Sequence, residues 1–417
     1  MSKQSGYFTV QDVSISAFNW RNVGRIDWLM PLLALALAVV GWFTIYSASR
    51  TGDPSLFQKQ ILFFAIGGGI ALVLACTDYR FIVSMAPVIY VVVVSLLVCV
   101  LLFGEVVNGA RRWIDLGPFN LQPSELSKLA LIFMLTWYLG KVGKRIKRLP
   151  YFLGTFVLAL VPMLLILKQP NLGTAVTLGP IAVVMLFVAG CRVRHMAALT
   201  LVGFMVVPFV WFQMHDFNPN TEEFEAAKPG AERNAVRDRM KKEYKADRKA
   251  YEFQWHQKMR IYSFLHPEAD KDASWQTVQS KITVGSGGLR GKGYLNSTQT
   301  ILKYLPEHHT DFIFSLLAEE QGFIGAALVI GLFAAFFLRG LAFARECPDM
   351  AGVLLATGVV TVLAFHVFVN IGITIGLLPV TGLPLPFLSY GGSFYLTTMS
   401  CVGILLNVPM RRLMFSD

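Results

Sequence analysis

The sequence predicts an all-α, polytopic membrane protein with about ten transmembrane helices. Apolar residues make up 54% of the 417 residues and charged residues only 15%, whereas about a quarter of the residues in a soluble domain are charged. The mean hydropathy is positive. Several uninterrupted apolar runs approach or exceed the roughly 20 residues with which a helix crosses a bilayer. These observations exclude an ordinary soluble protein.

Ten apolar segments can be counted along the chain. They lie near residues 27–48, 58–76, 81–103, 124–140, 151–168, 172–190, 196–214, 311–338, 351–376 and 391–409. The first follows a polar stretch and lacks a small-residue cleavage site, so it is expected to be a membrane helix rather than a signal peptide. The chain is therefore divided into an N-terminal tail, residues 1–26, and a ten-helix membrane domain, residues 27–417.

The short connections between these segments differ in positive charge. One alternating set is rich in Lys and Arg and includes the run KVGKRIKR, residues 141–148, whereas the other set is much poorer. Because basic loops are retained in the cytoplasm, both termini are expected there. Residues 215–310, between spans seven and eight, then form a large extracytoplasmic loop. The net charge of +11 is explained by this topology, and no nucleic-acid partner is expected.

A Gly-rich run, Gly285–Gly293, lies near the end of the large loop. It does not fit the P-loop template, because Ser286 replaces the first glycine and Gly293 stands where Ser or Thr must bind magnesium. No nucleotide is therefore expected. A flexible loop with exposed amides, Arg290 and Lys292 would suit an anionic diphosphate headgroup. A tight turn carrying two solvated cations is an equal alternative.

The motif Pro306–Asp311 leads directly into the eighth apolar segment. Asp311 and Thr310 could each cap that helix, which is the commonest role for an Asp at a helix start. A carboxylate at the membrane surface can instead act as a general base, and one acidic residue and two histidines, residues 307–309, precede it closely. Both roles of Asp311 stay open from the residues alone.

Polar residues also surround the start of the fourth apolar segment. Arg112 and Trp113 lie in the outer loop before it, where anchoring at the interface and contact with lipid headgroups are both ordinary roles. Glu125 and Lys128 are three residues apart and therefore share one helix face. Ionisable groups inside a membrane helix usually face a cavity or a partner. This pair is expected either to line a site or to join two helices.

Two later features are interpreted structurally. His366 and Asn370, four residues apart in the ninth segment, are expected to make hydrogen bonds between helices. The Pro- and Gly-containing stretches Lys168–Gly173 and Leu378–Ser393 break helices. Irregular backbone at membrane depth must be satisfied by protein or by a water-filled cavity. The second stretch is therefore predicted to be a re-entrant cavity wall.

Several long motifs are similar to those of one known family. They are GARRWIDLGPFNLQPSELSKLAL, QPNLGT, QSKITVGSGGLRGKGYLNSTQT, LPEHHTDFIFSLLAEEQGFIG and NIGITIGLLPVTGLPLPFLSYGGS. With ten spans in that order, the chain from about residue 27 onward resembles the SEDS family (shape, elongation, division and sporulation) of bacterial cell-wall polymerases. GSGGLRGKGYLNSTQT and TGLPLPFLSYGGS resemble its RodA-like elongation branch more than its division branch.

The resemblance implies a peptidoglycan glycosyltransferase that polymerises lipid II into glycan strands during cell elongation and rod-shape maintenance. It implies a multi-pass protein of the bacterial inner (cytoplasmic) membrane with an outward-facing active site. The implied partners are a class B penicillin-binding protein as transpeptidase, the nascent glycan and other elongation-complex proteins. A flippase or transporter of lipid-linked precursors is the alternative, because ten spans, broken helices and buried charges also suit a transporter.

The resemblance also assigns site residues. The family's essential Asp falls on Asp311 in HTDFIF, and its loop Trp falls on Trp113. Asp311 would accept the proton from the sugar 4-hydroxyl of the acceptor as this oxygen attacks C1 of the donor with inversion. The predicted substrate-binding residues are Arg112, Trp113, Glu125, Lys128, Lys281, Arg290, Lys292 and His309.

The diphosphate leaving group of such a reaction requires charge neutralisation. The candidate cations are Arg112, Lys128, Arg290 and Lys292. A divalent cation, Mg²⁺ or Mn²⁺, bridging the diphosphate and the carboxylate is a candidate cofactor. Its ligands are unknown, because neither the five cysteines nor any other ligand-type residues show metal-binding spacing.

The chain departs from the family pattern at two places. The usual QPDLG reads QPNLG, with Asn171 in place of the acid, which calls any role needing a negative charge there into question. The second departure is an extra charged segment of the large loop, Asn218 to about Lys258, where relatives have a short link. A solvated surface helix is the favoured interpretation of the mixed-charge stretch 218–260 that contains this segment. Binding of a partner is a hypothesis that rests on position.

Overall fold

The computed structural model describes most of the chain. The described residues are 24, 26–50, 53–107, 110–115, 117, 120–215, 217, 231–247, 255–266, 271–302 and 309–411. Residues 1–23 of the predicted tail, Glu307 and His308 lie outside this part.

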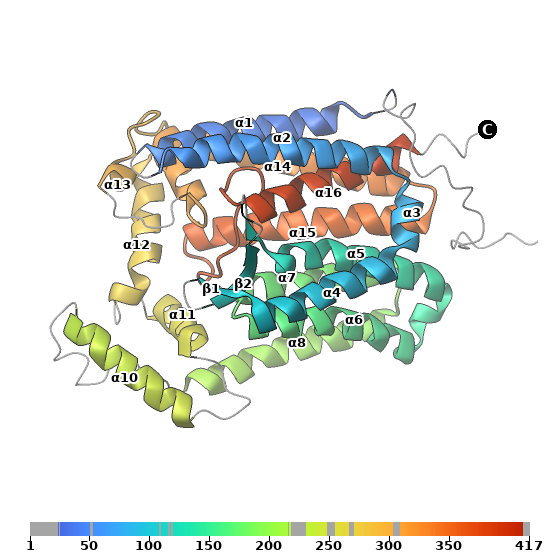
Figure 1. Ribbon diagram of the computed structural model, residues 1–417, viewed down its shortest axis with the longest axis horizontal. Coiled ribbons are helices and arrows are strands. Elements are labelled where there is room, and N and C mark those ends of the chain that lie inside the picture. Colours follow the sequence, from blue (N-terminus) through green and yellow to red (C-terminus); the bar gives the residue numbers. More distant parts are fainter. Residues whose placement is uncertain are drawn as a thin grey trace, which may run out of the picture.

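Ten apolar helices run side by side along the long axis of the molecule (Figure 1). They are α1 (Leu29–Ser49), α2 (Ser55–Cys76), α4 (Ala86–Phe103), α5 (Pro123–Val142), α6 (Leu149–Lys168), α7 (Leu172–Val188), α8 (Val193–Met214), α14 (Ile313–Glu346), α15 (Met350–Thr374) and α16 (Gly392–Met410). Each overlaps one predicted apolar segment. Within the described residues nine are long and apolar enough to span a membrane, and α7, with 17 residues, is the tenth. The predicted fold class is confirmed.

The helices differ in how deeply they are buried. In α16 and α15, 83% and 72% of the most apolar stretch is buried within the protein, against 6% in α8. The outer helices expose large apolar side chains such as Phe103, Leu201 and Trp211, as expected where lipid rather than water surrounds the protein. The centre of the bundle is therefore formed by α15 and α16, with α5 packed against both.

The two ends of the bundle carry different structures (Figure 1). One end carries the short helix α3 (Tyr79–Ser84), the 3-10 turn η3 (Gly143–Lys147) and the C-terminal end of α16. The other end carries the loops that were predicted to face outward, and one of these loops forms a small antiparallel sheet that the all-α expectation did not include. Its strands are β1 (Glu105–Val107), β2 (Ala110–Asp115) and β3 (Asn120–Leu121). β2 is central, with Glu105 opposite Trp113 and Ile114 opposite Leu121.

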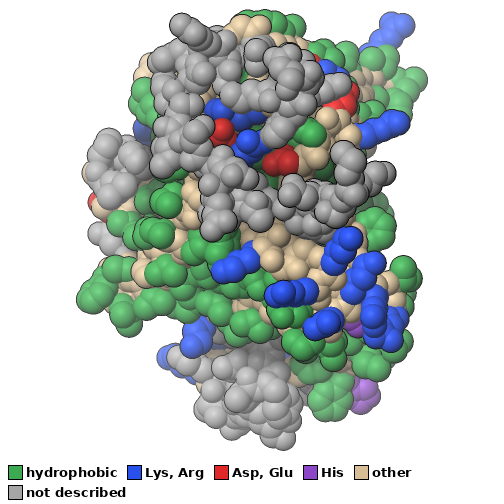
Figure 2. All heavy atoms as spheres, turned by 90° about the vertical axis from the view of Figure 1, so that its right-hand side faces the viewer, with side chains coloured by type: hydrophobic (Ala, Val, Ile, Leu, Met, Phe, Trp, Pro, Cys, Tyr) green, Lys and Arg blue, Asp and Glu red, His purple; other side chains and the backbone are tan. Residues whose placement is uncertain are grey.

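The end with η3 is strongly basic. Figure 2 shows a group of blue Lys and Arg side chains in the lower right part of this face, where no red acidic ones are seen among them. The exposed residues include five from the run 141–148 and two at the start of α8: Lys141, Lys144, Arg145, Lys147, Arg148, Arg192 and Arg194. The positive charge that the sequence analysis assigned to one set of loops therefore lies on one end of the bundle.

The large loop also contains helices, which lie at the opposite end. They are α10 (Ala231–Asp247), α11 (Trp255–Leu265), α12 (Lys271–Ser286) and α13 (Thr298–Ile301). α10 lies outside the bundle (Figure 1) and is the helix expected within the extra charged segment, whose residues 218–230 and 248–254 lie outside the described part. Tyr244 of α10 packs edge-on against Phe217 and Trp255, and the Lys258 ammonium lies 5.0 Å from the Tyr244 ring. These contacts join α10 to the end of α8 and to α11. A role of this segment in partner binding stays a prediction.

Candidate active site at the re-entrant segment

The segment between α15 and α16, residues 375–391, is non-helical, and its middle part is buried in the protein. Leu383, Leu385, Leu388 and Ser389 are each at most 1% exposed. Gly382 has a φ of +74°, a conformation that only glycine adopts without strain. The Pro- and Gly-containing stretch is therefore irregular and partly buried between two central helices, as predicted, whereas its role as a cavity wall stays a prediction. It is called the re-entrant segment below.

Asp311 lies beside this wall. Its Oδ2 is 3.7 Å from the point that a Cβ on Gly382 would occupy. Helix α14 begins at Ile313, and the residue in its N-cap position is Phe312, without a side-chain cap. Neither Asp311 nor Thr310 therefore occupies the N-cap position of this helix. The carboxyl side chain stands one residue before the cap position, next to the re-entrant segment.

Two arginines share the electrostatic environment of Asp311. Burial lowers the pKa of Arg112 below its usual value, and the nearby Arg260 lowers it further, while Asp311 raises it. Burial likewise lowers the pKa of Arg260, and Asp311 raises it. A carboxylate and two partly desolvated guanidinium groups from three separate segments therefore lie within electrostatic reach of one another.

Arg112 is oriented by backbone carbonyls at the joint between α6 and α7. Its Nε donates to the carbonyl of Gln169 at 3.0 Å, and its Nη2 donates to the carbonyl of Pro170. Gln169 is held in turn, because its Nε2 donates to the carbonyl of Leu97 at 3.0 Å. The planar guanidinium makes these bonds from two separate nitrogens in a fixed geometry, which the single ammonium nitrogen of a lysine would not reproduce.

Arg260 is a residue that the sequence analysis did not select. It lies in α11, in the run RIYSFL, and is the last residue of the mixed-charge stretch 218–260. Mixed charge at helical spacing is typical of a solvated helix, so this stretch was not expected to contribute to a site. One feature of the sequence could have identified Arg260. Apolar residues resume immediately after it, which indicates that this part of the helix can pack against the bundle.

Glu125 and Lys128 form a buried ion pair within α5. Lys128 Nζ lies 2.7 Å from Glu125 Oε2 and 3.0 Å from His366 Nε2, and Lys128 is 1% exposed. His366 Nδ1 lies 3.2 Å from the carbonyl of Pro384. The pair is thus intrahelical, and His366 connects it both to α15 and to the re-entrant segment. The expectation that His366 bonds between helices is confirmed.

The Gly-rich run does not form the flexible loop that the sequence analysis offered as one alternative. The amides of Lys292 and Gly293 donate to the carbonyls of Glu319 and Glu320 at 2.9 and 3.0 Å. In the reverse direction, the amides of Phe323 and Ile324 in α14 donate to the carbonyls of residues 288 and 289 at 2.9 and 3.2 Å. The expectation of exposed amides is therefore wrong for residues 292 and 293. The backbone of the run is used to bind α14.

This contact requires an interruption of α14 at Gly322. Gly322 has φ 68° and ψ −169°, which is far from helical. The break exposes backbone groups of α14 that an unbroken helix would have paired internally, and residues 288–293 satisfy them. We call this the loop–helix contact. The tight approach explains why glycines occupy both sides, since a Cβ on Gly291 would stand 2.1 Å from the carbonyl oxygen of Glu320.

Side chains reinforce the loop–helix contact. Lys292 Nζ lies 2.6 Å from Glu319 Oε1, and Ser297 donates to Glu319 Oε2 at 2.5 Å. Glu320 accepts from Ser47 of α1. Both carboxylates are buried in α14. Each of these acids therefore has a specific polar partner, as is usual for acids inside membrane helices. The ammonium of Lys292 is directed at Glu319, so its role in substrate binding stays a prediction.

The remaining predicted residues lie around the same end of the bundle. Trp113 is half-buried in β2, and Arg290 is exposed. Lys281 of α12 is exposed and lies across Gly376, where its Cε is 1.7 Å from the point that a Cβ would occupy. The His309 ring is 6.3 Å from that of Tyr390 in the re-entrant segment. Their contact with a substrate stays a prediction.

Asn171 has a local role that needs no charge. Its Oδ1 accepts from the amide of Thr174 at 3.3 Å and thereby caps α7. Its Nδ2 is 3.4 Å from Ser124 Oγ at the start of α5. A carboxylate could accept the first bond but could not donate the second. Asn171 therefore joins two helix starts as a neutral residue.

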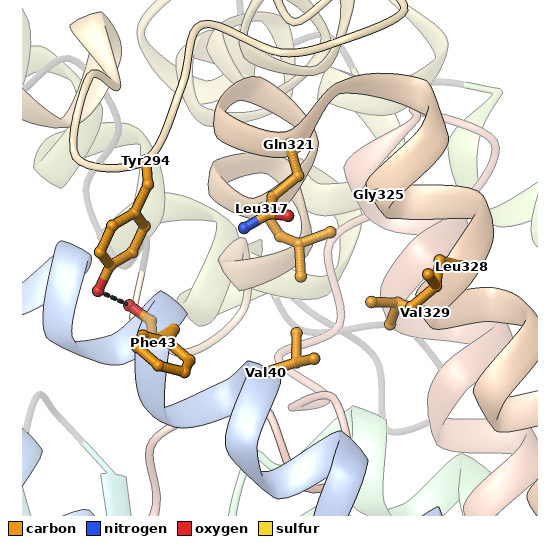
Figure 3. A pocket seen from close by; sticks show the side chains of 8 residues that line it. All are labelled: Val40, Phe43, Tyr294, Leu317, Gln321, Gly325, Leu328 and Val329. Carbon is orange, nitrogen blue, oxygen red and sulfur yellow. Dashed lines mark hydrogen bonds between the residues drawn. The ribbon is translucent and has the colours of Figure 1, made fainter.

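A pocket of about 220 Å³ lies elsewhere, between α1 and α14. Figure 3 shows Tyr294, whose hydroxyl donates to the carbonyl of Phe43 at 3.1 Å, on one side of the pocket and Gln321 on another. The lining residues are Val40, Phe43, Tyr294, Leu317, Gln321, Gly325, Leu328 and Val329. None of them is charged and none is a predicted site residue, so this pocket lacks the groups that a diphosphate needs.

The described residues around Asp311, which do not include residues 303–308, show no set of ligands for a metal ion. Mg²⁺ and Mn²⁺ prefer several oxygen ligands, whereas the groups that share the environment of Asp311 include two guanidinium cations. The described residues contain no group of three or more His, Cys, Asp or Glu placed to hold a metal. A divalent cation stays a prediction, and no step below depends on one.

The fold and this site define a polytopic membrane protein with a polar centre at one end of its helix bundle. Residues 27–413 match the family model of FtsW, RodA and SpoVE, which is described as "Cell cycle protein". The chain belongs to this family, and the resemblance found in the sequence motifs is confirmed.

Named relatives extend over nearly the whole chain. The peptidoglycan glycosyltransferase MrdB of Escherichia coli (strain K12) is 35% identical over 401 residues, covering 95% of this chain and 96% of that protein. The peptidoglycan glycosyltransferase RodA of Treponema pallidum (strain Nichols) is 34% identical, with 94% and 99% covered. A probable peptidoglycan glycosyltransferase FtsW of Geobacter sulfurreducens (strain DL-1 / KN400) is 35% identical, with 94% and 97% covered.

Solved structures share the fold. A chain of a peptidoglycan synthase complex, described as coordinating polymerization and crosslinking, superposes with a TM-score of 0.72 at 29% identity and covers 94% of this chain and 99% of its own. The rod shape determining protein RodA of Thermus thermophilus superposes with a TM-score of 0.64 at 28% identity, with 94% and 98% covered.

Proposed function

We propose that this protein is a peptidoglycan glycosyltransferase that polymerises lipid II into glycan strands during cell elongation. The observation that carries the proposal is the position of Asp311, which stands beside Gly382 of the re-entrant segment in the field of Arg112 and Arg260. Named peptidoglycan glycosyltransferases align with nearly the whole chain. The motifs GSGGLRGKGYLNSTQT and TGLPLPFLSYGGS favour the elongation branch of the family.

Asp311 acts as the general base in the proposed mechanism. Its carboxylate accepts the proton of the acceptor's 4-hydroxyl while that oxygen forms the bond to C1 of the donor sugar. The bond between C1 and the diphosphate breaks in the same displacement, so the configuration at C1 inverts and undecaprenyl diphosphate leaves. One base suffices, because no covalent sugar–enzyme intermediate is formed.

Arg112 and Arg260 stabilise the charge that develops on the diphosphate. Each guanidinium is partly desolvated, which strengthens its interaction with an anion. The carbonyls of Gln169 and Pro170 use two of the Arg112 donors and orient the remaining ones. Arg260 thus joins the predicted cations, whereas Lys292 is directed at Glu319.

Orientation and partner are part of the same proposal. The basic end of the bundle lies in the cytoplasm with both termini, by the positive-inside rule. The site then faces outward across the inner (cytoplasmic) membrane, where lipid II and the nascent glycan are bound. The relationship to a chain of a peptidoglycan synthase complex supports a class B penicillin-binding protein as the partner that crosslinks the product.

Asp311→Asn is expected to abolish polymerisation. A positioned general base contributes about 10² to 10⁴-fold to the rate, and the amide cannot accept the proton. The measurement is a gel of glycan products formed from lipid II by the purified, detergent-solubilised protein, with and without a class B penicillin-binding protein. The control is Asp115→Asn, which changes an exposed carboxylate of β2 that accepts from the amide of Gly117.

Full polymer yield from Asp311→Asn would refute the assignment. Absence of product from the wild-type protein in both arms would instead favour a transporter of the lipid-linked precursor, since detergent solution leaves no membrane to cross.

Arg112→Ala and Arg260→Ala are each expected to lower kcat/KM by about 100-fold, because removing one preorganised donor for developing charge typically costs 10² to 10³-fold. Initial rates of glycan formation over a range of lipid II concentrations measure this effect. Arg111→Ala is the matched control, since Arg111 is exposed on the same strand and its Nη1 reaches the carbonyl of Leu102 at 3.4 Å. Equal losses in Arg111→Ala and Arg260→Ala would contradict the specific role.

A further inference from the structure

The backbone directly before α14 is held by donors from other parts of the chain. Three consecutive carbonyls, those of residues 309, 310 and 311, each accept one hydrogen bond. The amide of Tyr390 donates to the first at 2.9 Å, the hydroxyl of Ser389 to the second at 2.6 Å, and the side-chain amide of Asn370 to the third at 2.9 Å. We call these three groups the donor triplet.

These carbonyls precede the first helical turn of α14. The helical hydrogen bonds of α14 begin at the carbonyl of Phe312, which accepts from the amides of Ser315 and Leu316 at 3.1 and 3.5 Å. The preceding residues, including Asp311, are in turn conformation rather than helix. A carbonyl that is shielded from water is costly to leave without a donor, and the donor triplet gives each of these three half-buried carbonyls a hydrogen bond.

The two side chains of the donor triplet are themselves fixed. Asn370 is fully buried in α15, and the same Nδ2 donates to the carbonyl of Leu383 at 2.8 Å. Ser389 is also fully buried, and its Oγ accepts from the amide of Leu385 at 2.8 Å. Each side chain therefore bonds the backbone of the re-entrant segment and the backbone that carries Asp311 at the same time. The distance between these two backbones is set by Asn370 and Ser389.

We propose that Asn370 and Ser389 are positioning residues for the Asp311 carboxylate. They hold the non-helical residues 309–311 against the re-entrant segment, so that Asp311 stays beside Gly382 and near the two arginines. The inference rests on the proposed function, in which Asp311 is the base. It extends that function, because Asn370 was expected only to join helices and Ser389 was assigned no role. A displacement of about 1 Å in a reacting group can cost about 100-fold in rate.

The test compares variants of the full-length, detergent-solubilised protein with lipid II as substrate. Ser389→Ala removes one donor and creates little strain, and Asn370→Asp keeps the shape of the side chain but replaces its donor by an acceptor. Both are expected to lower kcat by about 10- to 100-fold and to leave KM within about twofold, because the base moves while the groups that bind the substrate stay. Ser389→Thr keeps the hydroxyl and is expected to restore most of the rate.

The matched control is Thr398→Val. Thr398 is 1% exposed in α16, and its hydroxyl donates only to the carbonyl of Phe394 within the same helix at 2.9 Å. This variant loses a buried hydroxyl without touching the Asp311 backbone, so its kcat is expected to equal that of the wild type. An equal fall of kcat in Thr398→Val and Ser389→Ala would overturn the proposal, since the effect would then be general to buried hydroxyls.

Asp311→Asn is measured beside these variants, so that a failure of the positioning role can be told apart from a failure of the proposed function. Wild-type kcat in Ser389→Ala, together with an inactive Asp311→Asn, would overturn the positioning role and leave the proposed function standing. An active Asp311→Asn would remove the proposed function itself. Should Asn370→Asp fail to fold, Ser389→Ala and Ser389→Thr decide the question by the change in kcat and its recovery.

Discussion

Gly291→Ala is expected to destabilise the folded protein by about 4 kcal/mol or more. Gly291 has a φ of +78°, where a residue with a Cβ costs about 1–2 kcal/mol. The added Cβ would stand 2.1 Å from the carbonyl oxygen of Glu320 and 2.6 Å from the amide nitrogen of Gly322. Both neighbours are backbone atoms and cannot rotate away. Residues 288–293 and the backbone of α14 must therefore move apart, which breaks backbone hydrogen bonds worth about 1 kcal/mol each.

The measurement is thermal unfolding in detergent, combined with the yield of monodisperse protein. Gly285→Ala is the matched control, because Gly285 lies in α12 with no atom within 4 Å of its added Cβ and alanine favours a helix by about 1 kcal/mol. The control is expected to unfold at or slightly above the wild-type temperature. A Gly291→Ala protein with wild-type thermal stability would show that the loop–helix contact does not hold α14.

Lys128→Met is expected to cost about 3–5 kcal/mol of stability. It leaves the Glu125 carboxylate buried in α5 without its cation, and an uncompensated buried charge carries most of that cost. The double variant Glu125→Gln/Lys128→Met removes both charges and is expected to be less destabilised than Lys128→Met alone. This order of stabilities is expected for a buried ion pair. If the two residues acted independently, the losses of stability in the two single variants would add in the double variant.

The measurement is again unfolding in detergent, with all four members of the cycle compared under one condition. Lys141→Met serves as the control on the same helix. Lys141 is exposed, and its ammonium lies 4.8 Å from the centre of the Trp137 ring, a contact worth about 0.5–1 kcal/mol at an exposed site. If the double variant proved less stable than Lys128→Met, the interpretation as a mutually compensating pair would be contradicted.

Both expected results concern motifs that the sequence identified without showing their partners. The pairing of Glu125 with Lys128 could be predicted, because residues three apart on a helix are neighbours whatever the rest of the fold does. Their contact with His366 could not, since 238 residues separate Lys128 from it along the chain. In the same way, the glycines of residues 285–293 indicate a close approach of backbone, but their partner is a break in α14 that periodicity does not reveal.

The sequence by itself determined the ten apolar helices, the basic end of the bundle and the irregular re-entrant segment, and its family motifs predicted the role of Asp311. These features follow from composition, local spacing and motifs, which act within one segment. Only the tertiary structure placed Arg260 in the field of Asp311, moved Asp311 out of the helix-cap position, and brought Asn370 and Ser389 to the backbone that carries it. The physical reason is that a hydrogen bond or charge pair depends on distance in space, and packing of the whole bundle sets that distance for residues far apart in the chain.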